Sequence, residues 1–318
     1  MSNKVIHVAA AAVVNNNNEI LISQRAPDAH QGGLWEFPGG KLESGESVQQ
    51  ALLRELDEEL GICANSYRPL IKIMHQYPDK TILLDVWKVD DYTGKPVGRE
   101  GQAIRWQAID QLNQAEFPAA NVAIIQALNL PEHYLITGKF GSIHEFEERL
   151  GRAIDSGIRL AQLRLTHEWL KTVNEKQSTE IVKLATDLCE QSNVRLMFNM
   201  PDELNHIITP ACLHLNSRKL QQFTERPDCD YLSASCHNVQ EMMDAQALGV
   251  DFMVLSPVQA TMSHPDITPL GWQQFSEMIA QVNVPVYALG GVSIDDTEKA
   301  WLAGGQGVAA IGALWNPG

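Results

Sequence analysis

Eight short apolar runs recur through the second half of the chain, and they restrict its fold more than any other feature. Polar stretches with helical periodicity separate the runs, which lie at 134–137, 160–165, 195–199, 212–216, 231–235, 252–256, 284–289 and 308–311. Parallel strands that are buried on both faces give continuous apolar runs of this kind. About eight strands that alternate with helices within about 180 residues predict a TIM-type (β/α)8 barrel, with a doubly wound open sheet as the alternative.

The first part of the chain has a different pattern, so we expect two α/β domains. A length of 318 residues favours the same division. Pro131-Glu132 marks the expected boundary, with domains at 1–130 and 133–318. In the first domain we expect strands at 5–14 and 19–23 joined by a hairpin turn at the four asparagines 15–18. Further strands are expected at 70–74 and 81–89, and helices from Ser47 to Gly61 and at 120–128.

Composition narrows the possible partners. The net charge of −15 argues against binding a nucleic acid polymer, although a single nucleotide can still bind through a metal ion and a few local cations. The five cysteines form no CxxC pair and are expected to be reduced. The N-terminus does not resemble a signal peptide, and no apolar run reaches the ~18 residues that span a bilayer. We therefore expect a cytoplasmic protein without a membrane partner, and the oligomeric state stays open.

The acidic segment, residues 40–62, contains the clearest chemical signal. Glu55, Glu58 and Glu59 are three or four residues apart, so on a helix they share one face. Three neighbouring carboxylates repel one another unless a cation lies among them, and clustered oxygen ligands suit Mg²⁺. A solvated acidic helix face is the alternative for these three glutamates alone. The metal site is favoured by Arg54 beside Glu55, by the further acid Glu46 and by the Gly39-Gly40 pair.

The spacing Gly40-x5-Glu46-x7-Arg54-Glu55-Leu56-x-Glu58-Glu59-x-Gly61-Ile62 resembles the Nudix box at every defined position. The resemblance implies an α/β/α sandwich with a mixed sheet, whose box helix binds Mg²⁺, with Mn²⁺ as an alternative. It also implies cleavage of a nucleoside diphosphate linked to another group. The implied metal ligands are Glu55, Glu58, Glu59 and the Gly39 carbonyl.

Flanking segments resemble the MutT branch of this family, the 8-oxo-dGTP diphosphatases. They lie at 25–30, 34–41, 77–79, 98–102 and 116–121. The resemblance implies that Glu100 is an additional metal ligand or base, and that Asn121 reads the edge of an oxidised purine. The other implied substrate residues are Arg25, His30, Phe37, Lys41 and Asp79. An amide can distinguish the N7–H of an oxidised guanine from the N7 acceptor of guanine.

The implied reaction is attack of water on phosphorus, most simply the β-phosphorus, with a nucleoside monophosphate and pyrophosphate as products. Glu55 or Glu100 takes the proton, and Arg54 belongs to the same catalytic group. The sequence leaves structural alternatives open. Asn121 also fits a helix N-cap, Phe37 a core position and Arg25 a surface position.

The second domain resembles thiamine phosphate synthase and its TenI-like relatives, which are (β/α)8 barrels. The resemblance rests on segments at 162–164, 213–215, 233–237, 256–258 and 288–292, together with Thr261. It implies a phosphate site that involves Arg164, Gly290, Gly291 and Gly312, and a thiamine-related phosphate as ligand. The glycines also fit tight turns at strand ends, and His237 fits either a site residue or a structural histidine.

This domain departs from the synthase pattern at several positions. Thr166 stands where the synthases have a lysine that holds pyrophosphate, and Met200 stands where they have an aspartate that binds Mg²⁺. Pro257 replaces the histidine of the TenI tautomerases. Three hypotheses follow for the whole chain: a hydrolase that removes oxidised nucleotides and has a degenerate barrel, a bifunctional hydrolase and synthase, or a hydrolase regulated by a barrel that binds a phosphate ligand.

Overall fold

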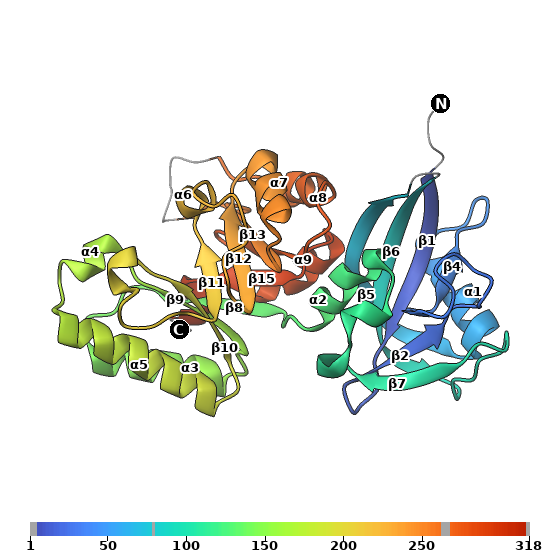
Figure 1. Cartoon of the computed structure of the whole chain (residues 1–318), viewed down its shortest axis with the longest axis horizontal. Helices are drawn as coiled ribbons and strands as arrows, with labels where there is room; N and C mark the ends of the chain where they lie inside the picture. Colours follow the sequence, from blue (N-terminus) through green and yellow to red (C-terminus); the bar gives the residue numbers. More distant parts are fainter. Residues whose placement is uncertain (1–4, 78–79, 262–267, 316–318) are drawn as a thin grey trace. The chain divides into compact units, whose positions relative to one another are not determined.

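The computed structural model describes residues 5–77, 80–261 and 268–315. The chain divides into two compact units, one formed by 1–129 with 280–283, and the other by 130–279 with 284–318. Each unit has its own strands and its own core, so the units are described separately (Figure 1). No helix among the described residues is both long and apolar enough to cross a membrane.

The first unit contains two small sheets. The four-stranded mixed sheet has the order β4-β1-β6-β5, and the three-stranded antiparallel sheet has the order β3-β2-β7. The strands are β1 (Val5–Val13), β2 (Glu19–Gln24), β3 (Trp35–Glu36), β4 (Gly39–Lys41), β5 (Cys63–Gln76), β6 (Thr81–Thr93) and β7 (Ile104–Ala108). The helices are α1 (Val48–Glu55), continued by the π-helical turn η1 (Leu56–Leu60), and α2 (Val122–Leu128), which follows short 3₁₀ turns.

The second half of strand β1 is buried on both faces, and its side chains point alternately toward the two helices that cover the sheet. Ala9, Ala11 and Val13 pack with Leu52 and other residues of α1 and η1. The intervening residues of β1 pack on the opposite face with α2. Successive side chains of a strand point to opposite faces, so one run of small residues lies between two helices. The mixed α/β fold expected for this part of the chain is confirmed.

The expected hairpin between β1 and β2 is only partly correct. The turn at 15–18 exists, with Asn18 in the left-handed region at φ 58°. A single antiparallel bridge, Val14–Ile20, follows it, and the two strands then enter different sheets. A turn signal predicts a change of chain direction, but the packing of α1 and α2 decides which strands pair afterwards.

The second unit is a closed barrel of eight parallel strands, as expected, and the open-sheet alternative is wrong. Its strands are β8 (His133–Ile136), β9 (Leu160–Arg164), β10 (Arg195–Asn199), β11 (Cys212–Leu215), β12 (Tyr231–Cys236), β13 (Phe252–Leu255), β14 (Val286–Leu289) and β15 (Gly307–Ala310). Its helices are α3 (Ile143–Asp155), α4 (His167–Leu170), α5 (Glu175–Gln191), α6 (Ser217–Leu220), α7 (Val239–Leu248), α8 (Gly271–Ile279), α9 (Thr297–Leu302) and α10 (Gly312–Trp315).

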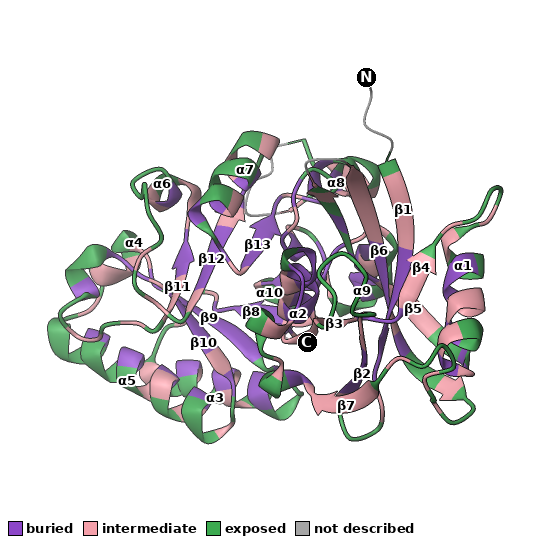
Figure 2. Ribbon diagram, turned by 45° about the vertical axis from the view of Figure 1, so that its right-hand side comes forward, coloured by how far each residue is buried: buried purple, intermediate pink, exposed green. Residues whose placement is uncertain are grey.

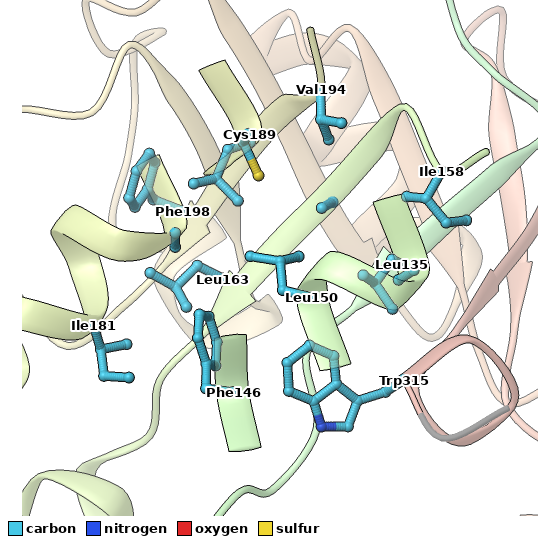
Figure 3. Packing of buried hydrophobic residues seen from close by; sticks show 14 of the residues in the cluster. Leu135, Phe146, Leu150, Ile158, Leu163, Ile181, Cys189, Val194, Phe198 and Trp315 are labelled. Carbon is cyan, nitrogen blue, oxygen red and sulfur yellow. The ribbon is translucent and has the colours of Figure 1, made fainter. Parts of the chain in front are cut away.

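The helices cover the outside of this barrel with buried inner faces and exposed outer faces (Figure 2). Helix α3 begins at Ser142, whose hydroxyl accepts from the Glu145 backbone N–H at 3.1 Å. Phe146 and Leu150 of α3 pack with Leu163 of β9 and with Trp315 of α10 (Figure 3). The last short helix therefore packs against the first long one and closes the helical layer of the barrel.

Candidate active site

Helix α1 begins with a reciprocal cap. The Ser47 hydroxyl accepts from the Gln50 backbone N–H at 3.2 Å, and the Gln50 side chain accepts from the Ser47 N–H at 2.8 Å. The helix was expected to continue uniformly to Gly61, but it widens into the π turn η1 from Leu56 onwards. Gly61 ends this turn with φ 70°, in the left-handed region that glycine adopts without cost. A π turn inside a helix is rare and frequently occurs at functional sites.

Arg54 connects the acids of this segment. Its guanidinium binds Glu46 through two hydrogen bonds, Nε to Oε1 at 2.9 Å and Nη2 to Oε2 at 3.0 Å. Its Nη1 donates to Glu55 at 2.9 Å and to Glu58 at 3.0 Å, and Nη2 also donates to the Lys41 carbonyl at 3.1 Å. These bonds account for every N–H donor that a guanidinium has. Arg54 is therefore a positioning residue, because it has no donor left for a substrate phosphate.

Glu59 lies among other carboxylates. Its Oε2 accepts from the Gly39 backbone N–H at 3.1 Å, which fixes the carboxylate against β4. Burial is the main cause that raises the pKa of Glu59 to about 8; the charges of Glu55, Glu100 and Glu36 act in the same direction, and the Gly39 N–H opposes them. A carboxylate with this environment holds a proton at neutral pH unless a cation lies beside it.

Gly40 allows Glu55 to approach the backbone of β4. A Cβ atom on residue 40 would lie 2.0 Å from Oε1 of Glu55, so any side chain there would displace this carboxylate. Gly39 has a different requirement, since its φ of 146° and the Ala9 carbonyl 2.1 Å from an added Cβ both exclude larger residues. The glycine pair thus brings the strand close to both Glu55 and Glu59.

The donor set of this site fits a hard divalent cation. It consists only of carboxylate and carbonyl oxygens, and burial together with the neighbouring acids destabilises the ionised form of Glu59. Among the described residues, no three acidic, histidine or cysteine side chains converge as a preassembled metal-ligand set. The reason is electrostatic: like charges separate, and Arg54 holds Glu55 and Glu58 while Gly39 holds Glu59.

Phe37 and Phe117 form a stacked aromatic pair. Phe37 and Phe117 have ring centroids 5.7 Å apart, and each is 5% exposed. Both belong to the core cluster that includes Ala123 and other residues of α2, so Phe37 has the core position that was one expectation for it. Asn121 is 8% exposed and precedes α2, but its side chain forms no cap hydrogen bond. Its position is that of an N-cap, and its amide does not serve as one.

The remaining expected substrate residues lie in different environments. Arg25 pairs with Glu36 of β3 and donates to the His30 carbonyl at 3.0 Å, and its side chain is 24% exposed, so it is not a solvated surface residue. His30 is exposed and contacts the ring of Tyr77 edge-on at 5.2 Å. Lys41 and Glu100 are exposed. Asp79 lies outside the described residues.

A hydrogen-bonded polar network lies in the interior of the barrel. The Asn199 amide donates to the Gln162 carbonyl at 3.1 Å, and the Gln162 amide donates to the Tyr134 hydroxyl at 2.8 Å. Each ring nitrogen of His214 lies 2.8 Å from a serine hydroxyl, those of Ser233 and Ser235. Burial and the charge of Arg164 lower the pKa of His214 to about 3. The network is therefore neutral, and the fixed positive charge beside it belongs to Arg164, at the end of β9.

The glycines expected to bind phosphate have conformational reasons to be glycine. Gly290 and Gly291 have φ values of 93° and 70°, and an added Cβ would lie 2.8 Å from Pro257 and 2.3 Å from the Ala260 carbonyl, respectively. The tight-turn alternative thus accounts for both of them. Gly312 begins the short helix α10, with open space around it. His237 lies 3.0 Å from the Ser256 carbonyl through Nδ1, which favours a structural role for this ring nitrogen.

Several residues at these sites have contacts that the sequence did not indicate, although some of them lie in the matching segments 34–41 and 98–102. Glu36 contributes to the charge around Glu59, but in sequence it is only one polar residue between aromatic ones. The Gln102 amide donates to the Glu59 carbonyl at 3.2 Å, and Arg99 donates to the Asp57 carbonyl at 2.7 Å, so the 98–102 loop holds η1. Lys219 binds the end of β10 from α6, and no sequence motif marks this contact.

Comparison with known families matches the two parts of the chain separately. A family model described as a NUDIX domain matches residues 9–127. A second family model, described as thiamine monophosphate synthase, matches residues 133–314. Both resemblances seen in the sequence are confirmed by these matches.

Individual relatives divide in the same way. An 8-oxo-dGTP diphosphatase of Escherichia coli (strain K12) is 42% identical over 125 residues, which cover 39% of this chain and 97% of the relative. A CTP pyrophosphohydrolase of the same organism is 37% identical over 124 residues, covering 39% of this chain and 91% of the relative. A protein of Aquifex aeolicus (strain VF5), provisionally named thiamine-phosphate synthase 2, is 27% identical over 186 residues, which cover 58% of this chain and 97% of the relative.

Proposed function

The chain belongs to the Nudix family over residues 9–127 and to the thiamine monophosphate synthase family over residues 133–314, and from this premise we propose a specific substrate and cofactor. The chain is a Nudix pyrophosphohydrolase. We propose that it hydrolyses oxidised purine nucleoside triphosphates, with 8-oxo-dGTP giving 8-oxo-dGMP and pyrophosphate. Removal of such nucleotides before DNA replication would be its biological role.

The observation that supports this proposal most directly is the environment of Glu59. Its carboxylate is held by the Gly39 N–H, and its pKa is raised to about 8 by burial and by nearby acids. Such strongly perturbed groups cluster at functional sites, because a ligand or reaction has to offset their cost. A divalent cation that carries a triphosphate offsets this cost directly.

In the proposed mechanism the ion would be held by Glu55, Glu58, Glu59, Glu100 and the Gly39 carbonyl. Mg²⁺, or Mn²⁺ in its place, would neutralise charge on the triphosphate and lower the pKa of water. Glu55 or Glu100 accepts the proton as water attacks the β-phosphorus. Arg54 keeps Glu55 and Glu58 in position, and Lys41 faces the phosphates.

Discrimination between bases is assigned to Asn121. The residue is 8% exposed and its side chain forms no cap hydrogen bond, so its amide can bind the edge of a purine base. A buried polar group that stays unpaired against the wrong substrate produces strong discrimination. Arg25 and His30 are assigned to the same substrate site as Asn121, and Asp79, outside the described residues, is proposed as a further substrate residue.

For the barrel we propose binding of a phosphate-bearing ligand, of the thiamine-related class, in place of full synthase activity. We assign phosphate binding to Arg164 and to the backbone of the glycine turns, whereas Thr166 and Met200 replace residues that the synthases use for pyrophosphate and metal. Regulation of the hydrolase by this ligand is the consequence we favour. The bifunctional alternative requires formation of thiamine phosphate by the purified chain, and a direct assay of that product tests it.

The substrate proposal is tested by steady-state kcat/KM values for 8-oxo-dGTP, dGTP, CTP and several ADP-linked compounds in the presence of Mg²⁺. We expect 8-oxo-dGTP to exceed dGTP by roughly 100-fold or more, as expected for a site whose polar groups would be left unpaired by the wrong base. A preference for CTP or for an ADP-linked compound would contradict the role of Asn121. Hydrolysis would still be assigned to the acidic segment in that case.

A further inference from the structure

Lys219 occupies an unusual position at the mouth of the barrel. It lies in α6, whose N-cap Asn216 accepts from the Lys219 backbone N–H at 3.0 Å. The Lys219 ammonium donates to the Met200 carbonyl at 2.8 Å and to Oδ1 of Asp202 at 2.6 Å. Its side chain is only 24% exposed, and the pair lowers the pKa of Asp202. The lysine is therefore fixed at both its backbone and its side chain.

This arrangement does not fit the divalent metal that the synthase resemblance implies. The metal would be held by an aspartate at residue 200, where this chain has Met200, which is 6% exposed and packs in the core cluster with Phe198 and Leu204. A thioether is a poor ligand for Mg²⁺, which requires oxygen atoms. The Lys219 ammonium already contacts the backbone carbonyl of the same residue, and its charge repels a second cation there.

We infer that the barrel mouth binds a phosphate-bearing anion without a divalent metal, and that the Lys219 ammonium and the Arg164 guanidinium supply the positive charge that a metal would otherwise provide. This inference rests on the proposed role of the barrel as a phosphate-binding domain. It adds that this site, in contrast to the hydrolase site, is independent of Mg²⁺.

The two cations lie on either side of the same strand end. Arg164 ends β9 and is in register with Asn199 of β10, which directly precedes Met200. Leu160 packs in the interior cluster, and Gln162 bonds to the interior network, so alternation along β9 directs Arg164 toward the interior as well. Within the described part of the chain, the Arg164 guanidinium has no hydrogen-bond or ion-pair partner.

The hydrogen-bonding capacity of Lys219 is not exhausted by its two contacts. An ammonium group has three N–H donors, and the Met200 carbonyl and Asp202 use two of them. The third donor and the free guanidinium of Arg164 can each bind oxygens of a phosphate-bearing anion. The neutral network of Asn199, Gln162 and His214 beside them provides polar contacts without adding negative charge that would repel an anion.

The inference is tested by calorimetric titration of the full chain with inorganic pyrophosphate in EDTA, where the hydrolase site is without its metal. We expect binding by the unmodified chain, and affinities at least 10-fold weaker for Lys219→Gln and Arg164→Gln. Lys183→Gln, which removes an exposed lysine of α5, is the matched control and should bind as the unmodified chain does. Asp202→Asn removes the competing carboxylate and should bind several-fold more tightly, even if Lys219→Gln fails to fold.

Other outcomes overturn the inference in distinguishable ways. Binding that appears only with Mg²⁺, persists in Glu59→Gln and is lost in Arg164→Gln would show a metal-dependent barrel, which refutes the role of Lys219 but retains the phosphate-binding domain. Absence of binding with and without Mg²⁺ would refute the proposed role of the barrel as well. Equal or weaker affinity in Asp202→Asn would exclude the Lys219 ammonium as a ligand group.

Discussion

At the scale of single residues, Glu59 provides the most direct test of the hydrolase site. Glu59→Gln keeps the shape of the side chain and its hydrogen bond from Gly39, but it removes the negative charge that binds the metal. We expect kcat/KM for 8-oxo-dGTP to fall by at least about 100-fold, the range typical of lost catalytic groups. Glu43→Gln, an exposed change close to the same helix, should leave the rate within about 2-fold. Near-normal turnover in Glu59→Gln would refute the metal site.

The titration of Glu59 also predicts a pH dependence of stability in metal-free protein. The folded pKa, about 8, lies above the ordinary value of 4.5, so the folded state binds more protons than the unfolded state between these values. The free energy of unfolding must therefore fall as pH rises through this window. We expect the melting temperature in EDTA to decrease relative to that of Glu59→Gln between about pH 5 and pH 8. Parallel curves for the two proteins would contradict the raised pKa.

A substitution of Asn121 can distinguish a structural role of this residue from a role in substrate recognition. Because its side chain forms no cap bond, Asn121→Ala should cost little stability, whereas Asn238→Ala, which removes the cap of α7, should cost about 1 kcal/mol. If Asn121 reads the base, the preference for 8-oxo-dGTP over dGTP should decrease by about 10- to 100-fold, the value of one or two hydrogen bonds. If Asn121→Ala keeps the preference for 8-oxo-dGTP over dGTP and loses much stability, the role of Asn121 is purely structural.

At the scale of elements, continuous apolar runs predicted the barrel well and turn signals predicted pairing poorly. The eight runs of the second unit each became a strand, because a strand covered on both faces is built mostly of apolar residues. The turn after β1 was visible in the sequence, but its strands separate into two sheets. Packing against α1 and α2 decides this, and packing partners far apart in the sequence leave no local signal.

The acidic segment was predictable from residue spacing, but its geometry was not. The spacing of Glu55, Glu58 and Glu59 predicts a shared face, whereas the π turn from Leu56 onwards depends on the left-handed Gly61 and on the 98–102 loop that holds η1. The five bonds of Arg54 involve residues 13 positions apart or fewer, and the sequence indicated only the neighbouring pair with Glu55. The contact of Lys219 with Met200 connects two barrel loops and required the closed fold.

Strand β4 lies so close to α1 that a side chain at residue 40 is expected to displace the Glu55 carboxylate. Gly40→Ala requires no change of backbone conformation, but the new methyl group would lie 2.0 Å from the Glu55 carboxylate. We expect that carboxylate to move and kcat to fall by about 10-fold or more, since displacements near 1 Å in catalytic groups have effects of this size. Gly151→Ala adds a methyl group in open space on α3 and should leave kcat unchanged. Full activity in Gly40→Ala would mean that Glu55 acts from another position.

At the scale of the whole molecule, two units with separate cores should respond to different ligands. Each unit has its own clusters of buried residues, which favours two unfolding transitions. A ligand that binds only the folded form of one unit raises the stability of that unit, by about 2.7 kcal/mol at 100 times its Kd. Mg²⁺ should therefore shift one transition, and pyrophosphate in EDTA should shift the other.

Differential scanning calorimetry of the full chain measures both responses in one experiment. Glu59→Gln should abolish the shift caused by Mg²⁺ and leave the shift caused by pyrophosphate, and Lys219→Gln should do the reverse. This reciprocal pattern would assign each ligand to one unit without separating the units. A single transition that moves as a whole with either ligand would instead show that the two units unfold cooperatively. Binding at the barrel would then necessarily stabilise the hydrolase, because one cooperative transition couples the free energies of both sites.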